Sequence, residues 1–227
     1  MPRRKPYLKK VGKPQFYPVL INLRRFPCLI VGGGKVAQRK VLSLLEFNAR
    51  VTVVAPRLCT QLLELNEHRR INIIRRRYSA VLLEGFKIVF AATDNAAINR
   101  RIRRDCSDAG ILLNAVDDRT RCDFILPANV KRGDLIVSVS SQGKAPFYAV
   151  AVKKRLERSL SPAFADIIKL AAEFRTQVLG NRKPKSPGAR AKLFRKFAAT
   201  DWEEILNHAG QDRSGKRLRQ ILKEYST

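Results

Sequence analysis

The chain has 227 residues, of which 45% are hydrophobic, so it can bury a real core in one large domain or two small ones. No apolar run approaches the roughly 18 residues that a membrane span needs, and residues 1–16 lack the following apolar stretch of a secretory signal. The formal net charge of +27 is concentrated at the two ends, where nucleic acid, an anionic membrane surface, a polyanionic small molecule or a solvated basic surface would each account for it.

Strands and helices alternate in the first half of the sequence. Buried strands are predicted at 27–34, 50–56, 71–78, 86–94 and 111–118. Helices are predicted at 35–49, 58–68 and 95–110, the last with Gly110 as its C-cap. This β-α-β-α order predicts an α/β fold of the Rossmann type, a parallel sheet with right-handed crossovers and helices on both faces.

The pattern changes after residue 118. Two strand-like runs, 124–130 and 135–141, are joined by the sequence KRGD, which is typical of a hairpin with a glycine in its turn. The remainder is rich in predicted helices, at 146–160, 162–179, 189–198, 201–208 and 213–225. Residues 181–188 are the expected flexible linker.

The glycine-rich stretch after the first strand has the spacing of a dinucleotide-binding loop. Gly32, Gly34 and Ala37 form G-x-G-x-x-A directly after a strand and at the start of a helix. Gly32 permits a tight turn, Gly34 lets the backbone approach a pyrophosphate, and Ala37 lets the helix pack close to the strand. The helix N-terminus adds free N–H groups and a partial positive charge. The strand–helix elements that follow favour dinucleotide binding over a glycine turn without a ligand.

The second strand lacks the acidic residue that usually binds the adenine ribose about 20 residues after the glycines. It ends instead at Pro56 and Arg57. Arg57 could stack on adenine, meet a 2′-phosphate or be a simple surface charge. The spacing therefore leaves both NAD and NADP open.

Two further strand ends lie at the edge where ligands bind in open parallel sheets. After the fourth strand, Thr93 can hydrogen-bond a cofactor ribose or nicotinamide, while the alanines beside it leave room. After the fifth strand, Asn114, Asp117 and Asp118 are expected close to the nicotinamide ring. A carboxylate there can accept a proton while hydride leaves to NAD. A turn or cap role fits Asp118 better than Asp117.

The cysteines and histidines indicate no metal site. There is no C-x-x-C pair, and no histidine stands at metal-ligand spacing from the cysteines, Cys28, Cys59, Cys106 and Cys122. The pattern favours free thiols in a reducing cytoplasm over disulfides or a zinc site. His68 and His208 have no partner nearby in the sequence, which favours structural roles for both.

Together these motifs resemble the precorrin-2 dehydrogenase / sirohydrochlorin ferrochelatase family, which also forms the N-terminal half of siroheme synthase. The segments that match in order, over roughly residues 16–180, are YPVLINLRRFPCLIVGGGKVAQRK, VTVVAP, FAATD, NAVDD, FILPANVKRGDLIVSVSSQGKAP and AVKKRLE. The combination of G-G-G-x-V-A-x-R-K, N-x-V-D and S-x-x-G-x-x-P is far more specific than any one of these motifs. No methyltransferase half follows in the sequence, as in the stand-alone form.

The resemblance implies how the chain is divided. A Rossmann-type parallel-sheet domain would be followed by a dimerisation region, whose strands are exchanged between subunits, and by a small helical domain. The expected ranges are a basic N-terminal extension at 1–15, the dinucleotide-binding domain at 16–115, the dimerisation region at 116–150 and the helical domain at 151–227.

The resemblance also implies an activity. Members oxidise precorrin-2 to sirohydrochlorin with NAD, and some insert ferrous iron as well. The expected protein is a cytoplasmic homodimer with a tetrapyrrole polycarboxylate as its substrate. Because precorrin-2 bears eight carboxylates, a basic cleft fits the chemistry, although the net charge exceeds what one such substrate needs.

Site residues follow from the same resemblance. The catalytic aspartate falls on Asp117. The cofactor contacts fall on the glycine loop and on the end of the second strand, at Gly32, Gly33, Gly34, Lys35, Val36, Ala37, Pro56 and Arg57, with Thr93 beside them. The expected substrate contacts are Asn114 and the serine–glycine loop, Ser140, Ser141 and Gly143.

A different class of protein would use the basic ends. A Rossmann-fold protein that senses NAD(P) for regulation, or that binds nucleic acid, would have no need of the NAVD and SSQG motifs. A K⁺-transport-type NAD-binding module is disfavoured, because the second strand lacks the acidic ribose ligand. We expect neither membrane association nor sequence-specific nucleic-acid binding.

Overall fold

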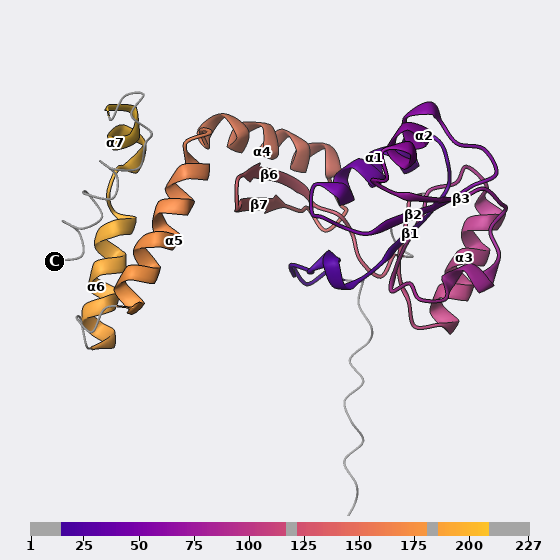
Figure 1. Cartoon of the computed structure of the whole chain (residues 1–227), viewed down its shortest axis with the longest axis horizontal. Coiled ribbons are helices and arrows are strands. Elements are labelled where there is room, and N and C mark those ends of the chain that lie inside the picture. Colours follow the sequence, from indigo (N-terminus) through magenta and orange to yellow (C-terminus); the bar gives the residue numbers. More distant parts are fainter. Residues whose placement is uncertain (1–14, 117–121, 181–185, 209–227) are drawn as a thin grey trace, which may run out of the picture. The chain divides into compact units, whose positions relative to one another are not determined.

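The computed structural model of the protein describes residues 15–116, 122–180 and 186–208. The chain forms two compact units, residues 1–126 and 127–227 (Figure 1). The division into four ranges that the sequence suggests stays a prediction. Among the described residues, every helix is too short or too polar to cross a membrane.

The first unit is built on a five-stranded parallel sheet with the strand order β3-β2-β1-β4-β5. Its strands are β1 (Cys28–Val31), β2 (Val51–Val54), β3 (Asn72–Ile74), β4 (Ile88–Ala91) and β5 (Leu112–Ala115). Every residue of β1 and β4 is buried, as expected of apolar central strands in a parallel sheet that is covered on both faces. The predicted Rossmann-type α/β fold is confirmed.

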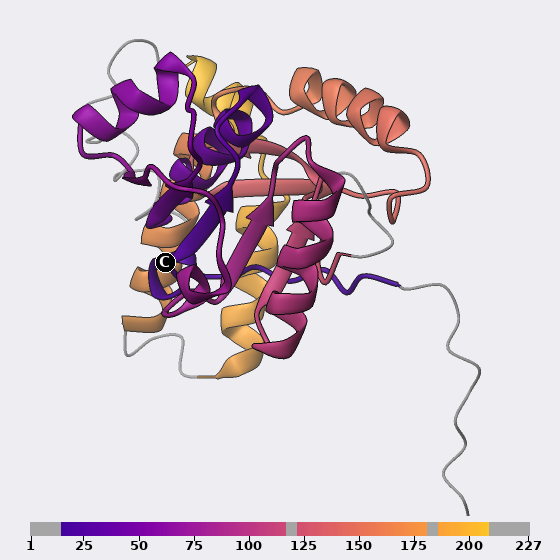
Figure 2. The ribbon, with the colours of Figure 1, turned by 90° about the vertical axis from the view of Figure 1, so that its right-hand side faces the viewer.

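Helices cover both faces of this sheet. They are α1 (Lys35–Leu45), α2 (Thr60–Glu67) and α3 (Ala96–Asp108), with short 3-10 turns η1 (Leu23–Arg25) and η2 (Ala80–Leu83). Figures 1 and 2 show α3 on the opposite side of the sheet from α1 and α2. Because strand side chains alternate between faces, Cys28 and Ile30 of β1 pack with α1 and α2, whereas Leu29 and Val31 pack with α3.

Both ends of α3 are capped. Asn95 caps its start, with Oδ1 accepting the N–H groups of Ala97 and Ile98 at 2.9 and 3.1 Å. Gly110 follows its end with a φ of +63°, in the left-handed region that a glycine adopts without strain. The predicted helix end is thus off by one position, because Ala109 is the C-cap and Gly110 is the left-handed residue that follows it.

One predicted strand begins later than its apolar pattern suggests. The sequence places it at 124–130, but β6 begins at Ala128. Phe124 and Ile125 instead pack into the two cores of the first unit, and the rings of Phe124 and Phe90 meet edge-on with centroids 5.5 Å apart. Phe124 and Ile125 therefore fill the cores of the first unit rather than extending the hairpin, whereas Leu126 is exposed.

The described part of the second unit contains the hairpin and four helices. Its elements are β6 (Ala128–Arg132), β7 (Leu135–Val139), α4 (Pro146–Ser159), α5 (Phe164–Gly180), α6 (Pro187–Ala198) and α7 (Trp202–His208). The hairpin and the predicted helices up to residue 208 are confirmed with small shifts at their ends. The helix predicted at 213–225 and residues 181–185 of the predicted linker lie outside the described residues.

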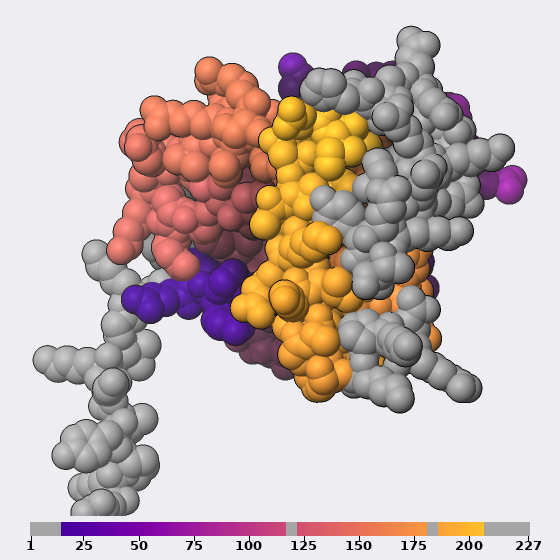
Figure 3. Space-filling view, turned by 90° about the vertical axis from the view of Figure 1, so that its left-hand side faces the viewer, coloured from indigo at the N-terminus to yellow at the C-terminus, as the bar shows by residue number. Residues whose placement is uncertain are grey.

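Aromatic side chains join α5, α6 and α7. The ring of Phe197 on α6 stacks on Phe174 of α5, with centroids 4.8 Å apart, and meets Trp202 of α7 at 4.4 Å. The Trp202 indole donates to the Phe197 carbonyl at 2.8 Å, so this buried N–H is satisfied. In the space-filling view of Figure 3, α6 and α7 form one continuous yellow and orange surface.

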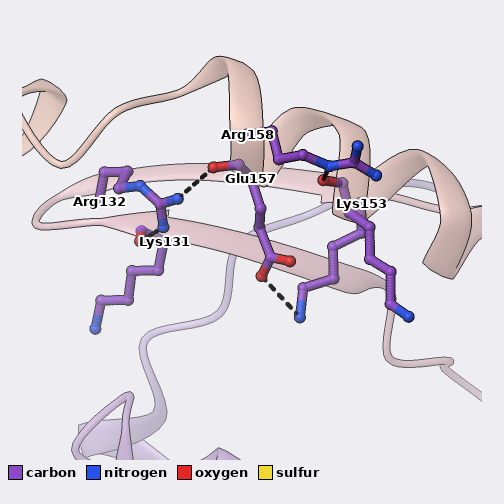
Figure 4. A network of polar contacts seen from close by, with 6 residues as sticks. Lys131, Arg132, Lys153, Glu157 and Arg158 are labelled. Atoms are coloured by element: carbon purple, nitrogen blue, oxygen red, sulfur yellow. Dashed lines mark hydrogen bonds and ion pairs between the residues drawn. The ribbon is translucent and has the colours of Figure 1, made fainter.

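Arg132 of β6 fastens the hairpin to the end of α4 (Figure 4). Its guanidinium donates to the carbonyls of Glu157 and Leu160, each at 2.8 Å, and to the Lys131 carbonyl at 3.0 Å. The last carbonyls of a helix have no N–H donor within the helix, and they lie at the negative end of its dipole. A cation that donates several hydrogen bonds there satisfies both needs, so Arg132 acts as a cap supplied by another element.

Candidate dinucleotide-binding site

The loop between β1 and α1 has the shape that two of its glycines impose. Gly32 has a φ of +136°, and a Cβ there would lie 2.3 Å from the carbonyl oxygen of Ala92. At Gly33 a Cβ would lie only 1.9 Å from the carbonyl oxygen of Arg57, and the Gly33 carbonyl accepts the N–H of Cys59 at 2.8 Å. The loop is thus held between the segments that follow β2 and β4, and neither position has room for a side chain.

Gly34 has a different environment. It is exposed, its φ is −93°, and no atom lies within 4 Å of the position that its Cβ would take. It is the N-cap of α1, so the N–H groups of Lys35, Val36 and Ala37 belong to the first turn and have no acceptor within the helix. Ala37 is fully buried against the sheet. Open space in front of free N–H groups is the arrangement that cradles a phosphate, and this contact stays a prediction.

The end of β2 forms the neighbouring wall of the loop. Pro56 and Arg57 are both exposed, and the Arg57 backbone packs against Gly33. The structure therefore brings these two predicted residues beside the glycine loop. Their contact with a cofactor stays a prediction.

Thr93 takes part in the turn that opens α3. Its hydroxyl donates to Oδ1 of Asn99 at 2.7 Å and accepts the N–H of Asn95 at 3.2 Å. The Asn99 amide in turn donates to the Thr93 carbonyl at 3.1 Å. This network fixes the turn after β4. Sequence reasoning missed Asn99, whose position on the inner face of an amphipathic helix was the available signal.

Asn114 is buried, and both ends of its amide are engaged within the first unit. Its Oδ1 accepts from Nζ of Lys40 at 3.2 Å, and its Nδ2 donates to the Phe124 carbonyl at 2.9 Å. Lys40 also lies 5.7 Å from the centroid of the Phe90 ring. Asn114 thus joins α1 and β5 to the segment that fills the core. Its predicted role in substrate binding stays a prediction, and Lys40, one helical turn after Ala37, is a site neighbour that sequence reasoning missed.

The chain on either side of Asp117 is anchored. Asp117 and Asp118 themselves lie outside the described residues. After them, the Cys122 thiol donates to the Ala115 carbonyl at 3.1 Å, and Oδ2 of Asp123 accepts the N–H of Leu113 at 2.9 Å. The described residues on the two sides of Asp117, Val116 and Cys122, therefore both lie at the carboxyl end of β5.

In the second unit, the predicted serine–glycine loop leads into α4. The hydroxyl of Ser140 accepts the N–H of Gln142 at 3.1 Å, and that of Ser141 accepts the N–H of Ala145 at 2.9 Å. Gln142 and Gly143 have φ values of +54° and +74°, so the chain turns tightly here. The two hydroxyls hold the turn that precedes the N-terminus of α4, and contact with a substrate stays a prediction.

The four cysteines are free thiols. Burial raises the pKa of the Cys28 thiol to about 11, and burial together with nearby carboxylates raises that of Cys106 to about 12. Both therefore stay protonated and unreactive near neutral pH. Among the described residues, no three His, Cys, Asp or Glu side chains come together as metal ligands would.

Comparison with known proteins agrees with this geometry. Residues 19–128 match the family model described as "Putative NAD(P)-binding". The chain is 36% identical over 192 residues to the siroheme synthase of Chromobacterium violaceum, a match that covers 85% of this chain and 39% of that protein. It is 35% identical over 208 residues to the siroheme synthase of Methylobacillus flagellatus, which covers 90% of this chain and 44% of that protein.

A solved structure described as SirC, precorrin-2 dehydrogenase shares the fold. It matches with a TM-score of 0.72 and 21% identity, over 92% of this chain and all of that one. The chain spans about two fifths of the length of the curated relatives that it matches.

Proposed function

Because the chain belongs to the precorrin-2 dehydrogenase and siroheme synthase family, we propose that it oxidises precorrin-2 to sirohydrochlorin with a nicotinamide dinucleotide. The observation that carries this proposal is the loop at Gly32–Gly34. It is closed by backbone on two sides, open at Gly34, and placed where β1 meets the N-terminus of α1. The relatives described above match most of the present chain, and they are siroheme synthases.

The reaction defines what the chain must provide. One carbon of the tetrapyrrole gives up a hydride, a second hydrogen leaves as a proton, and the electron pair of that second bond forms a new double bond in the macrocycle. A bound nicotinamide dinucleotide supplies the hydride acceptor and is reduced by the two electrons. The chain has to supply a base for the proton. Asp117, two residues after β5 in the sequence, is the base that we propose.

Charge and hydrogen-bond donors support a polycarboxylate substrate. Lys144 is exposed in the loop that Ser140 and Ser141 hold, and α4 begins two residues after it. Cations and a helix N-terminus both favour carboxylates. We propose that Ser140, Ser141 and Gly143 contact the tetrapyrrole.

A homodimer would complete the small sheet of the second unit. Within the residues that the structure describes, β6 and β7 pair only with each other. A two-stranded sheet is marginally stable in water, and its unpaired edges are templates for further strands. On α4, Phe147 and Tyr148 are 76% and 56% exposed. We propose that a second copy of the chain adds strands to this hairpin and covers this apolar surface.

Three finer assignments belong to the same proposal. NAD is the form of the acceptor that the resemblance implies, and we propose that it is sufficient for turnover. Ferrous iron is proposed as a second substrate, inserted into sirohydrochlorin. A cytoplasmic location agrees with the free thiols and stays a prediction.

The proposal is tested by incubating the full chain with precorrin-2 and NAD under anaerobic conditions. The absorbance bands of sirohydrochlorin and of NADH should rise together, and neither should rise without enzyme. Binding of NAD without any oxidation of precorrin-2 would reject the dehydrogenase while leaving the dinucleotide site in place.

A further inference from the structure

The ends of β2 and β3 carry arginines instead of the carboxylate that usually holds an adenine ribose. We infer that Arg57 and Arg76 bind a phosphate group on that ribose, so that this chain binds NADP more tightly than NAD. The inference rests on the proposed function of the glycine loop as a dinucleotide site. It concerns the 2′-phosphate of NADP, because the glycine loop alone does not distinguish NADP from NAD.

Strand pairing brings the two arginine-bearing segments to one edge of the sheet. β2 and β3 are parallel neighbours, with Val54 opposite Ile74. The pairing continues past the strand end, where the N–H of Ala55 donates to the Ile74 carbonyl at 3.3 Å. Arg57 and Arg76 follow these residues by two positions each. They therefore leave neighbouring strands at the same carboxyl edge, where Rossmann folds bind the adenine half of a dinucleotide.

The backbone ties this edge directly to the glycine loop. The carbonyl of Arg57 lies against Gly33, close enough that a Cβ on Gly33 would overlap it. The N–H of Cys59 donates to the Gly33 carbonyl at 2.8 Å. Whatever phosphate lies in front of α1 is thus next to the segment that carries Arg57, and the adenine ribose is the next group along a dinucleotide.

The residues that follow these two strand ends carry only positive charges. Arg57 and residues 75–77 are exposed, and a guanidinium nitrogen of Arg76 lies 3.5 Å from the Ser79 hydroxyl. The two stretches that lead to and from these strand ends, 47–63 and 68–83, contain no aspartate or glutamate. Neither stretch can therefore supply a carboxylate to neutralise these arginines or to accept from ribose hydroxyls.

A 2′-phosphate and a 2′-hydroxyl are bound by different side chains. A carboxylate accepts from the 2′-hydroxyl of NAD and repels a 2′-phosphate. A guanidinium makes a single hydrogen bond to an uncharged hydroxyl oxygen, whereas its hydrogen bonds to a phosphate join opposite charges and are often bidentate. Exposed guanidinium groups also lose little hydration when a solvated phosphate binds. The acid-free, arginine-bearing edge consequently favours the phosphorylated ribose.

The chain offers a matched control on the same two strands. Arg50 precedes β2 and Arg70 precedes β3 by two positions, and both are exposed at the opposite, amino edge of the sheet. Replacing Arg50 and Arg70 by serine removes the same charge as replacing Arg57 and Arg76. If overall charge controls the affinity for an anionic ligand, both double variants lose affinity equally. If a local phosphate contact controls it, only the variant without Arg57 and Arg76 loses affinity.

The test is isothermal titration of the full chain with NADP and NAD, repeated with 2′,5′-ADP and 5′-AMP as fragments. We expect NADP to bind at least ten-fold more tightly than NAD, with the same order for the fragments. Arg57→Ser with Arg76→Ser should abolish this preference by lowering the affinity for NADP at least ten-fold more than the affinity for NAD, and Arg50→Ser with Arg70→Ser should keep it.

Equal affinities, or tighter binding of NAD, would overturn the inference. Equal losses in the two double variants would also overturn it, because they would assign the preference to bulk charge. A preference for NADP in a chain that fails to oxidise precorrin-2 would uphold this inference and reject only the proposed reaction.

Discussion

The two units of the chain differ in how completely each buries its own apolar surface. In the first unit, both faces of a five-stranded sheet are covered by helices, and β1 and β4 are buried at every residue. In the second unit, the hairpin has only two strands, and Val130 is the only residue of β6 and β7 that is buried. Its helix α4 leaves Phe147 three-quarters exposed.

This difference suggests that the first unit binds the nucleotide and that the hairpin of the second unit forms the assembly contact. The first unit closes its own core, so a rigid glycine loop can stand at its edge without help from another chain. The second unit has open strand edges and an exposed apolar surface, which a second copy can cover. Changes in the first unit should therefore act on nucleotide binding, and changes in the hairpin should act on assembly.

The largest effect is expected at Asp117, the proposed base of the reaction. Asp117→Asn keeps the shape of the side chain and removes its basicity, so turnover should fall by about 10² to 10⁴ while dinucleotide affinity stays unchanged. Steady-state oxidation of precorrin-2 measures the first, and titration measures the second. Asp118→Asn is the matched control, and an equal loss in that variant would contradict a specific role for Asp117.

Two adjacent glycines should separate the rigidity of the first unit from its binding function. Gly33→Ala forces a methyl group into the Arg57 carbonyl and should destabilise the fold by about 1–3 kcal/mol or more. Gly34→Val enters open space, so the protein should stay folded, while the space for a phosphate is filled. Melting temperature and dinucleotide titration should therefore rank the two variants in opposite orders. Unchanged dinucleotide affinity in Gly34→Val would show that the loop is only a turn.

The open edge of the hairpin can be blocked without changing its core. Because a two-residue turn joins the hydrogen-bonded pair Arg132 and Leu135, the N–H of Ser138 points away from β6. Ser138→Pro removes this donor and should weaken dimerisation at least ten-fold. Sedimentation over a dilution series measures the effect, with Ser138→Ala as the control. A dimer of unaltered affinity in the proline variant would place the contact elsewhere.

The smallest effect is expected at Arg132, inside the second unit. Arg132→Met leaves two carbonyls at the end of α4 without their cation and should cost about 1–2 kcal/mol. Urea denaturation followed through Trp202 reports on this unit. Arg155→Met, an exposed position on the same helix, should change stability by less than about 0.5 kcal/mol. Equal midpoints for the two variants would remove the capping role.

The strand–helix alternation of the first unit is predictable because its apolar strands stop at turn residues. The role of Gly33 is not predictable in this way, because the Arg57 carbonyl that excludes a side chain comes from a distant segment. The same holds for Asn114, whose partners are Lys40 and Phe124. Periodicity reports which residues are buried along one element, and it does not report which other element they meet.

Phe124 and Ile125 illustrate the same limit from the opposite direction. Their apolar run is indistinguishable in sequence from the start of a strand, yet tertiary packing assigns them to the cores of the first unit. The local pattern predicts that these side chains are buried, and only the folded structure shows which elements bury them.

If the proposal is right, the nucleotide site of the first unit serves the oxidation of precorrin-2. The most direct measurement is the stoichiometry of a single anaerobic reaction, in which sirohydrochlorin and reduced dinucleotide are quantified together in the wild-type chain and in Gly34→Val. We expect one reduced dinucleotide for each sirohydrochlorin in the wild type, and neither product in the variant. Sirohydrochlorin formed at the wild-type rate by Gly34→Val, or without reduced dinucleotide, would contradict it.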